Sequence, residues 1–162
     1  FVEETAKACA RMQQSGWQLL FLPMQQEQDG EISIKAADKV CDITGEMPIV
    51  LEEQLTPAEM VSVFQNADMV LGMRLHALII GAALKKPVVG LAYDPKVSAF
   101  MESIKNEAYD ELAAVQSDDL LLHLSIAEGT EETGVNGDMI ERAVYPAYLA
   151  QEILQRADDL AK

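Results

Sequence analysis

The sequence is poor in cysteine, histidine, positive charge and long apolar runs. Its 162 residues include 2 Cys and 2 His, and 12 Lys and Arg stand against 27 Asp and Glu, for a net charge of −15. This acidic excess disfavours sequence-independent attraction to nucleic acid or to an anionic membrane surface. No apolar run approaches the ~20 residues that a membrane-spanning helix needs. Any anionic ligand must therefore bind at a local cationic site.

The two cysteines, Cys9 and Cys41, lie in segments with helical patterning. This placement predicts buried free thiols in a reducing compartment, and the pair lacks the spacing of a zinc site. A cytoplasmic location fits this pattern best. The chain opens with FVEETAKACARM, which has helical rhythm but no basic n-region, apolar h-region or initiator Met. We therefore expect it to be a piece of a longer protein.

Apolar strands and amphipathic helices alternate through most of the chain, and the strands are short and wholly apolar. Such strands are typical of parallel sheets that helices cover on both faces. The pattern predicts an α/β fold with a doubly wound parallel sheet, as one Rossmann-like domain over residues 1–162. The expected strands are Trp17–Pro23, Met47–Glu53, Met69–Met73 and Val88–Tyr93. The expected helices are Val2–Met12, Asp29–Thr44, one from Thr56 onward, Arg74–Lys86 and Pro95–Ile104.

Two helix starts have strong local signals. Thr56, Pro57 and Glu59 predict a capping box, with Pro at the first helical position, and Asp94 before Pro95 predicts a second capped start. In the helix that starts at Thr56 one face is apolar and is expected to be buried: Met60, Val63, Phe64 and Ala67.

The pattern is weaker towards the C-terminus. Leu112–Val115 is expected to form a last short strand, and Ser117–Leu124 a helix capped by Ser117. The acidic, glycine-rich stretch Gly129–Asp138 is expected to be an exposed loop before a terminal helix at Met139–Leu160.

Two junctions between a strand and the next helix carry unusual chemistry. GMRLHAL places Arg74 and His76 at the start of one helix, and AYDPKV places Tyr93, Asp94 and Lys96 at the start of the next. In open parallel sheets, ligands bind beyond the carboxyl ends of the strands. Arg74 could hold one anionic group bidentately, Lys96 another as a point charge, and His76 could exchange a proton between them. The pattern predicts a site for a ligand with two anionic groups.

Taken singly, each of these residues has a structural interpretation. His76 would be a core residue, Arg74 a clamp on a carboxylate, Asp94 a helix cap and Lys96 a surface lysine. Their position together at successive strand ends favours a site. His123 has no other candidate site residue near it in the sequence and is interpreted as a partly exposed helix residue. Dinucleotide, P-loop and serine-hydrolase motifs are missing from the sequence.

The run ADMVLGMRLHALIIGAALKKPVVGLAYDPKVSAF (Ala67–Phe100) closely resembles the signature of bacterial polysaccharide pyruvyltransferases involved in cell-surface anchoring. FLPMQQEQD (Phe21–Asp29) is also similar to that family. The resemblance is good from Trp17 to Ile104 and thin after that. Its most specific elements are RLH and YDPK at this spacing.

The resemblance implies a two-domain enzyme of glycosyltransferase-B shape, of which this chain is the C-terminal half and lacks the N-terminal domain. The donor would be phosphoenolpyruvate, and the acceptor a lipid-linked saccharide that allows peripheral contact with the inner face of the membrane. The product would be a pyruvyl ketal on a sugar such as N-acetylmannosamine. The mechanism demands no redox or metal cofactor. By the resemblance His76 is catalytic, and the substrate-binding residues are Arg74, Tyr93, Asp94 and Lys96. Arg74 and Lys96 would hold the phosphate and the carboxylate of the donor.

Two alternatives stay open at this point. A nucleotide-sugar-dependent glycosyltransferase of the same overall shape could use the cationic helix start for a diphosphate. A non-catalytic module could use the same cations to hold an anion. The residues also leave open which cation would take a phosphate and which a carboxylate.

Overall fold

The computed structural model describes residues 1–104, 108–109 and 115–129. Their contacts form two compact units. The first unit contains residues 1–54 and 115–125, and the second contains residues 55–104, 108–109 and 126–129. The contacts within each unit do not test the predicted single Rossmann-like domain, which stays a prediction.

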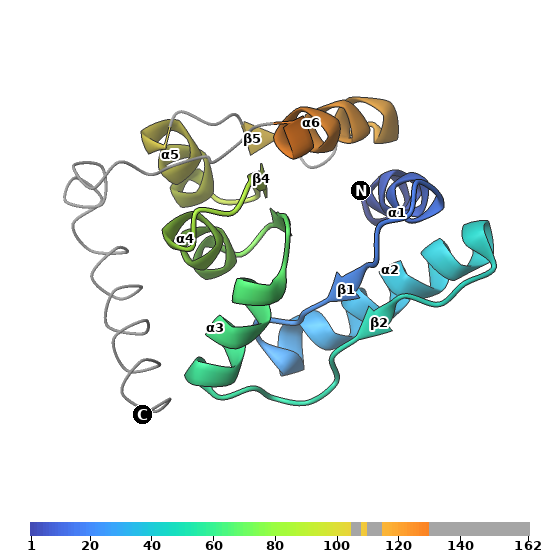
Figure 1. Ribbon diagram of the computed structural model, residues 1–162, viewed down its shortest axis with the longest axis horizontal. Coiled ribbons are helices and arrows are strands. Elements are labelled where there is room, and N and C mark those ends of the chain that lie inside the picture. Colours follow the sequence, from blue (N-terminus) through green and yellow to red (C-terminus); the bar gives the residue numbers. More distant parts are fainter. Residues whose placement is uncertain (105–107, 110–114, 130–162) are drawn as a thin grey trace. The chain divides into compact units, whose positions relative to one another are not determined.

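The first unit is built on two long helices and a small parallel sheet (Figure 1). Helix α1 (Val2–Gln14) packs along α2 (Gln26–Thr44), and strands β1 (Leu20–Phe21) and β2 (Ile49–Val50) pair in parallel. Small side chains dominate the buried face of α1, which lets the two helix backbones approach each other. That face consists of Ala6, Ala8, Cys9, Ala10 and Met12.

Glycines end both helices of the first unit, as the sequence predicts. Gly16 follows α1 with a φ of 101°, and Gly45 ends α2 in the left-handed conformation, where its N–H donates to the Cys41 carbonyl at 2.7 Å. The start of α2 differs from the expected Asp29. The helix begins at Gln26, because the Asp29 carboxylate accepts a hydrogen bond from the Gln25 N–H at 3.1 Å and so stabilises an earlier first turn.

A carboxylate from α1 caps helix α6 (Ser117–Gly129). The Ser117 N–H donates to Oε2 of Glu4 at 3.1 Å, and Lys7 donates to Oε1 of the same carboxylate at 2.7 Å. The hydrogen bonds from Lys7 and Ser117 lower the pKa of Glu4 from 4.5 to about 2. Arg11 also pairs with Asp118. The start of α6 therefore depends on a side chain more than one hundred residues away in sequence.

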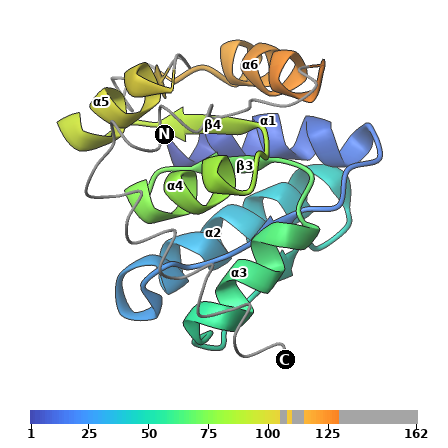
Figure 2. The same ribbon diagram turned by 60° about the vertical axis from the view of Figure 1, so that its left-hand side comes forward.

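The second unit contains a three-stranded parallel sheet in the order β3-β4-β5 with helices between the strands (Figure 2). All strand pairings in the described residues are parallel, as predicted, whereas the doubly wound sheet itself stays a prediction. In chain order the elements are α3 (Pro57–Asn66), β3 (Val70–Gly72), α4 (Leu75–Ala83), β4 (Val88–Leu91), α5 (Pro95–Ser103) and β5 (Ala108–Tyr109).

Helix α4 lies very close to the sheet, and Gly81 allows that approach. Val70 of β3 and Val88 of β4 are partners in register, and Gly81 sits against both. A Cβ added at Gly81 would lie 2.9 Å from Cγ1 of Val88 and 3.0 Å from Cγ2 of Val70. Leu78 of α4 and Met101 of α5 are fully buried and fill the neighbouring core.

The capping box at the start of α3 forms as predicted. Oγ1 of Thr56 accepts from the Glu59 N–H, and Oε2 of Glu59 accepts from the Thr56 N–H at 2.8 Å. The predicted apolar face is only partly right. Two residues of α3 are buried, the predicted Phe64 and also Val61, which was not predicted. The other predicted residues, Met60, Val63 and Ala67, are half-exposed.

Several expectations concern other parts of the chain. Of the expected strand Leu112–Val115, residues 112–114 lie outside the described residues, and the structure has β5 at Ala108–Tyr109. The expected loop and terminal helix over 130–160 also lie outside them.

Both cysteines are free. Cys9 is buried, and this burial raises its pKa to about 12, while Cys41 is only half-buried. In the described part of the chain, no helix combines the length and apolar character needed to cross a membrane.

Candidate functional site

The two predicted junctions lie at the same edge of one sheet. Strands β3 and β4 are hydrogen-bonded neighbours in parallel, with Gly72 opposite Gly90, so their carboxyl ends open on the same side. Helix α4 follows the first strand and α5 the second. The sequence therefore predicts correctly that the RLH and YDPK elements are adjacent.

Arg74 and Tyr93 join the two elements directly. Nη1 of Arg74 donates a hydrogen bond to the Tyr93 hydroxyl at 3.2 Å, and the guanidinium carbon lies 5.9 Å from the centre of the Tyr93 ring. A cation within about 6 Å of an aromatic face is attracted by the ring quadrupole. Arg74 is half-buried, while Tyr93 is 50% exposed. Tyr93 thus holds Arg74 at the sheet edge and remains accessible to a ligand.

The start of α4 differs from the other two helix starts of this unit. Arg74 occupies the N-cap position and makes no side-chain hydrogen bond to the first turn, whereas Thr56 caps α3 and Asp94 caps α5. A cation at the positive end of a helix dipole is locally unfavourable, and the first-turn N–H groups are suitable donors for an anion. His76 lies in this first turn with its side chain exposed.

Asp94 is a helix cap, as the alternative interpretation of this residue predicts. Its Oδ1 accepts a hydrogen bond from the Lys96 backbone N–H at 2.9 Å, and Pro95 takes the first helical position. The Lys96 side chain is exposed in the first turn of α5. Capping and ligand binding are compatible, because only one oxygen of the Asp94 carboxylate makes this bond. A ligand shared by His76 and Lys96 stays a prediction.

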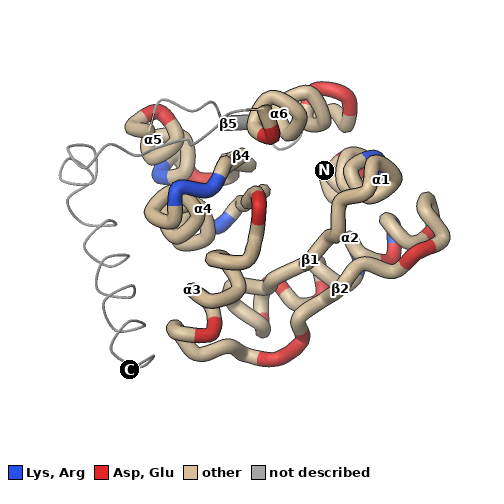
Figure 3. The backbone as a smooth tube through the Cα atoms, in the orientation of Figure 1, with Lys and Arg blue, Asp and Glu red and all other residues tan. Residues whose placement is uncertain are grey.

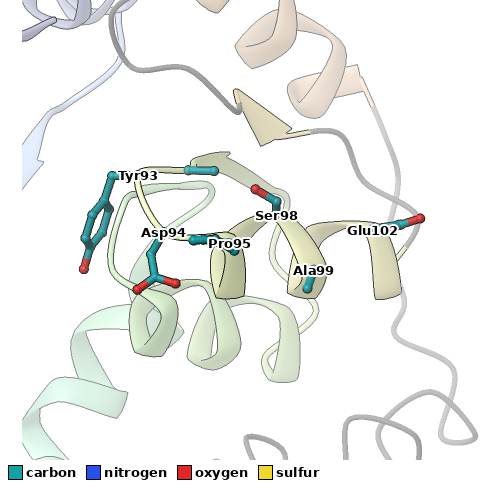
Figure 4. Close-up of a pocket in the computed structure, with 7 residues that line it drawn as sticks. Tyr93, Asp94, Pro95, Ser98, Ala99 and Glu102 are labelled. Carbon is teal, nitrogen blue, oxygen red and sulfur yellow. The ribbon is translucent and has the colours of Figure 1, made fainter.

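An open hollow of about 570 Å³ lies beside the second junction, along α5. Figure 4 shows Tyr93 and Asp94 at one end of it and Glu102 at the other. Of the five predicted site residues, Tyr93 and Asp94 are among its described lining residues. Sequence reasoning missed Ala92 and four residues of α5, although these four recur at the 3.6-residue period of one helix face, which is a signal in the sequence. These four residues are Pro95, Ser98, Ala99 and Glu102.

Charge is distributed unevenly along the chain, as the red and blue segments in Figure 3 show. Residues 1–54 carry ten acidic and four basic residues, whereas residues 55–104 carry four of each. The strong overall negative charge is therefore absent from the segment that contains the candidate site. An anionic ligand meets local cations there without a local acidic excess. These cations are Arg74, Lys85, Lys86 and Lys96.

Lys85 and Lys86 follow the end of α4 at Ala83, whereas the expected helix extends to Lys86. The N–H of Lys85 donates to the Ala82 carbonyl at 3.0 Å and that of Lys86 to the Gly81 carbonyl at 2.9 Å. Lys85 has a φ of 58°, and the two bonds form a Schellman motif. His123 is half-buried in α6, where Nδ1 contacts the Asp119 carbonyl at 2.8 Å. The expected structural roles of these residues are confirmed.

Comparison with known proteins gives one match. No curated protein and no solved structure shows significant similarity to the chain. A family model described as polysaccharide pyruvyl transferase matches residues 1–95. The matched region includes Arg74, His76, Tyr93 and Asp94 and ends just before Lys96. Because the match covers more than half of the 162 residues, the chain belongs to the polysaccharide pyruvyl transferase family.

Proposed function

We propose that this chain carries part of an active site that transfers a pyruvyl group from phosphoenolpyruvate to two hydroxyls of a cell-surface polysaccharide sugar, forming a cyclic ketal. Family membership supports pyruvyl transfer in general. The observation that carries the finer proposal is the contact between Arg74 and Tyr93, because it joins two motif elements, nineteen residues apart, at one sheet edge.

The donor has two anionic groups, a phosphate and a carboxylate, and the junctions offer matching groups. The planar Arg74 guanidinium suits bidentate contact with either group, and the Lys96 ammonium adds an exposed positive charge. The first-turn N–H groups of α4 provide further donors. Such preorganised donors favour the transition state where negative charge develops on the departing phosphate.

The reaction needs acid and base catalysis. A proton is added to C3 of the donor and a sugar hydroxyl oxygen bonds to C2. The C2–O bond to phosphate then breaks, and a second hydroxyl oxygen bonds to C2. Of the two hydroxyl protons released, one is balanced by the proton gained at C3 and the other leaves with phosphate. His76 is the proposed group for proton transfer or phosphate contact. The reaction involves no net oxidation or reduction, so it requires no redox cofactor.

Full-length protein provides the test. Incubated with phosphoenolpyruvate and lipid-linked disaccharides, it should release one phosphate per ketal formed, and mass spectrometry should detect the modified saccharide. His76→Ala should lower turnover strongly at unchanged stability, because the His76 side chain is exposed. The 162-residue chain alone should be inactive, since the proposed site needs a facing domain.

Ligand-dependent thermal stability separates this proposal from nucleotide-sugar transfer. A ligand that binds only the folded protein raises its apparent stability. Phosphoenolpyruvate should raise the midpoint of thermal unfolding of the full-length protein, while nucleotide sugars should leave it unchanged. Stabilisation by a nucleotide sugar alone would refute the proposed donor, and binding of phosphoenolpyruvate without any turnover would favour a non-catalytic module.

A further inference from the structure

The hollow beside α5 has the form of a binding surface along a single helix face. The residues of α5 that line it occupy the i, i+3, i+4 and i+7 positions, which are Pro95, Ser98, Ala99 and Glu102. Val97 and Met101, on the other face of the helix, are buried in the core. Because three of the four lining side chains are small, the helix face stays open. From Pro95 to Glu102 the face extends roughly 10 Å along the helix axis.

The size of the hollow suits a ligand larger than the three-carbon donor. Its volume of about 570 Å³ lies within the range of about 300–1,000 Å³ in which pockets for drug-sized ligands fall. The hollow is also open to solvent and not enclosed. An extended molecule could therefore lie in it with its ends outside.

The charge of the hollow argues against a second site for the donor. Asp94 and Glu102 contribute carboxylates at its two ends, and neither Lys nor Arg is among its described lining residues. A phosphate or carboxylate placed there would be repelled. Hydroxyl groups would instead donate charge-assisted hydrogen bonds to the carboxylates, and the Ser98 and Tyr93 hydroxyls can donate or accept. These groups favour a neutral, hydroxyl-rich ligand.

Tyr93 connects the hollow to the proposed donor site. Its hydroxyl is hydrogen-bonded by Arg74, and its side chain lines the end of the hollow next to Asp94. A ligand in the hollow would therefore end beside the group that holds the donor. We infer that this hollow binds the acceptor saccharide, with Ser98 and Glu102 as specificity-determining residues that contact its hydroxyls. The inference rests on the proposed function.

Kinetics with the full-length enzyme test the inference. The probe is a soluble disaccharide that ends in N-acetylmannosamine, with phosphoenolpyruvate as donor. Ser98→Phe should fill the hollow and raise the KM for the disaccharide about 10-fold or more, while the KM for phosphoenolpyruvate stays within about 2-fold of wild type. Glu102→Gln, which changes the carboxylate but not the shape, should raise only the KM for the disaccharide.

Ser103→Phe is the matched control, because Ser103 is an exposed serine of the same helix outside the described lining of the hollow. It should change neither KM. An unchanged KM for the disaccharide in both Ser98→Phe and Glu102→Gln would overturn the inference, as would a rise confined to the KM for phosphoenolpyruvate. If Ser98→Phe does not fold, Glu102→Gln alone decides.

A direct binding measurement keeps the inference separate from the proposed function. If wild-type enzyme shows no pyruvyl transfer, the proposed function fails, and titration calorimetry with the same disaccharide then tests the hollow alone. Binding that is lost in Ser98→Phe and retained in Ser103→Phe would support a saccharide site without transfer. Absence of binding to wild type would overturn the inference as well.

Discussion

Arg74 and Tyr93 form a side-chain contact that joins the two sequence elements of the candidate site. The Arg74 guanidinium donates to the Tyr93 hydroxyl at 3.2 Å and lies 5.9 Å from the ring centre. A long arginine side chain loses conformational entropy when it is fixed in one geometry. On the proposed function, the contact with Tyr93 lowers the entropic cost of donor binding to Arg74.

Tyr93→Phe tests this role because it removes the hydroxyl and keeps the ring. A hydrogen bond of this kind contributes about 0.5–1.5 kcal/mol, so the KM for phosphoenolpyruvate should rise about 2- to 10-fold while kcat changes little. Tyr93→Ala removes the ring as well and should raise that KM further. Steady-state kinetics of full-length enzyme give both values. A Tyr93→Phe enzyme with wild-type KM would show that the contact does not position Arg74.

Thr56→Ala should cost about 1 kcal/mol of unfolding free energy, because it removes the N-cap of α3 and half of the capping box with Glu59. Urea denaturation measures the loss. Thr56→Ser keeps the hydroxyl and should keep most of the stability. Turnover of full-length enzyme should be unaffected by either substitution, and a large loss of turnover at unchanged stability would mean that the site has been misplaced.

Gly81→Ala sets two effects against each other. Alanine favours a helix interior over glycine by up to about 1 kcal/mol, whereas overpacking of a core costs about 1–3 kcal/mol. The added methyl would lie within 3.0 Å of Val70 and Val88, which have restricted χ1 angles and little freedom to move. Overpacking should therefore dominate, and denaturation should show a net loss of stability.

Shortening one of these valines tests that explanation. Val88→Ala in the Gly81→Ala background should cost less than Val88→Ala alone, since the new methyl then occupies space that the valine leaves. Additive losses in the double-mutant cycle would refute a steric conflict at this position.

Glu4 should make the stability of the protein sensitive to acid. Its pKa is about 2 in the folded protein against an ordinary 4.5, so its carboxylate stabilises the fold above about pH 4.5. That contribution should decline as the pH falls from 4.5 towards 2. Glu4→Gln should lower stability at neutral pH and flatten this part of the pH profile. Chemical denaturation at a series of pH values measures both effects, and parallel profiles for the two proteins would exclude the role of Glu4.

Local signals in the sequence were sufficient for the helix starts and stops that depend on neighbouring residues. The capping box of Thr56 and the cap at Asp94 form as predicted, and α2 ends at Thr44 as expected, before the left-handed Gly45. Each involves hydrogen bonds within a few residues, so the sequence contains all the partners. The early start of α2 at Gln26 was missed because its capping contact, from Gln25 to Asp29, uses residue types at a spacing that has no strong sequence signature.

Tertiary contacts decided the features that the sequence did not reveal. The buried face of α3 includes Val61 in place of Val63, since both valines are equally apolar and only packing distinguishes them. The contact from Glu4 to Ser117 spans 113 positions and has no local pattern. For the candidate site, strand order brought Arg74 and Tyr93 together as expected. The hollow was missed because Ser98 and Ala99 belong to no recognisable motif, and only the folded structure shows the space beside them.

The start of α4 has consequences for the evolvability of the protein. An Asp at position 74, like the one at position 94, would cap the helix and gain about 1 kcal/mol. On the proposed function, Arg74→Asp should gain this cap and yet abolish pyruvyl transfer by the full-length enzyme. A marked loss of stability would instead identify Arg74 as a structural clamp. On the proposed function, selection for heat resistance alone would erode this site first, because natural proteins commonly retain locally unfavourable residues where activity needs them.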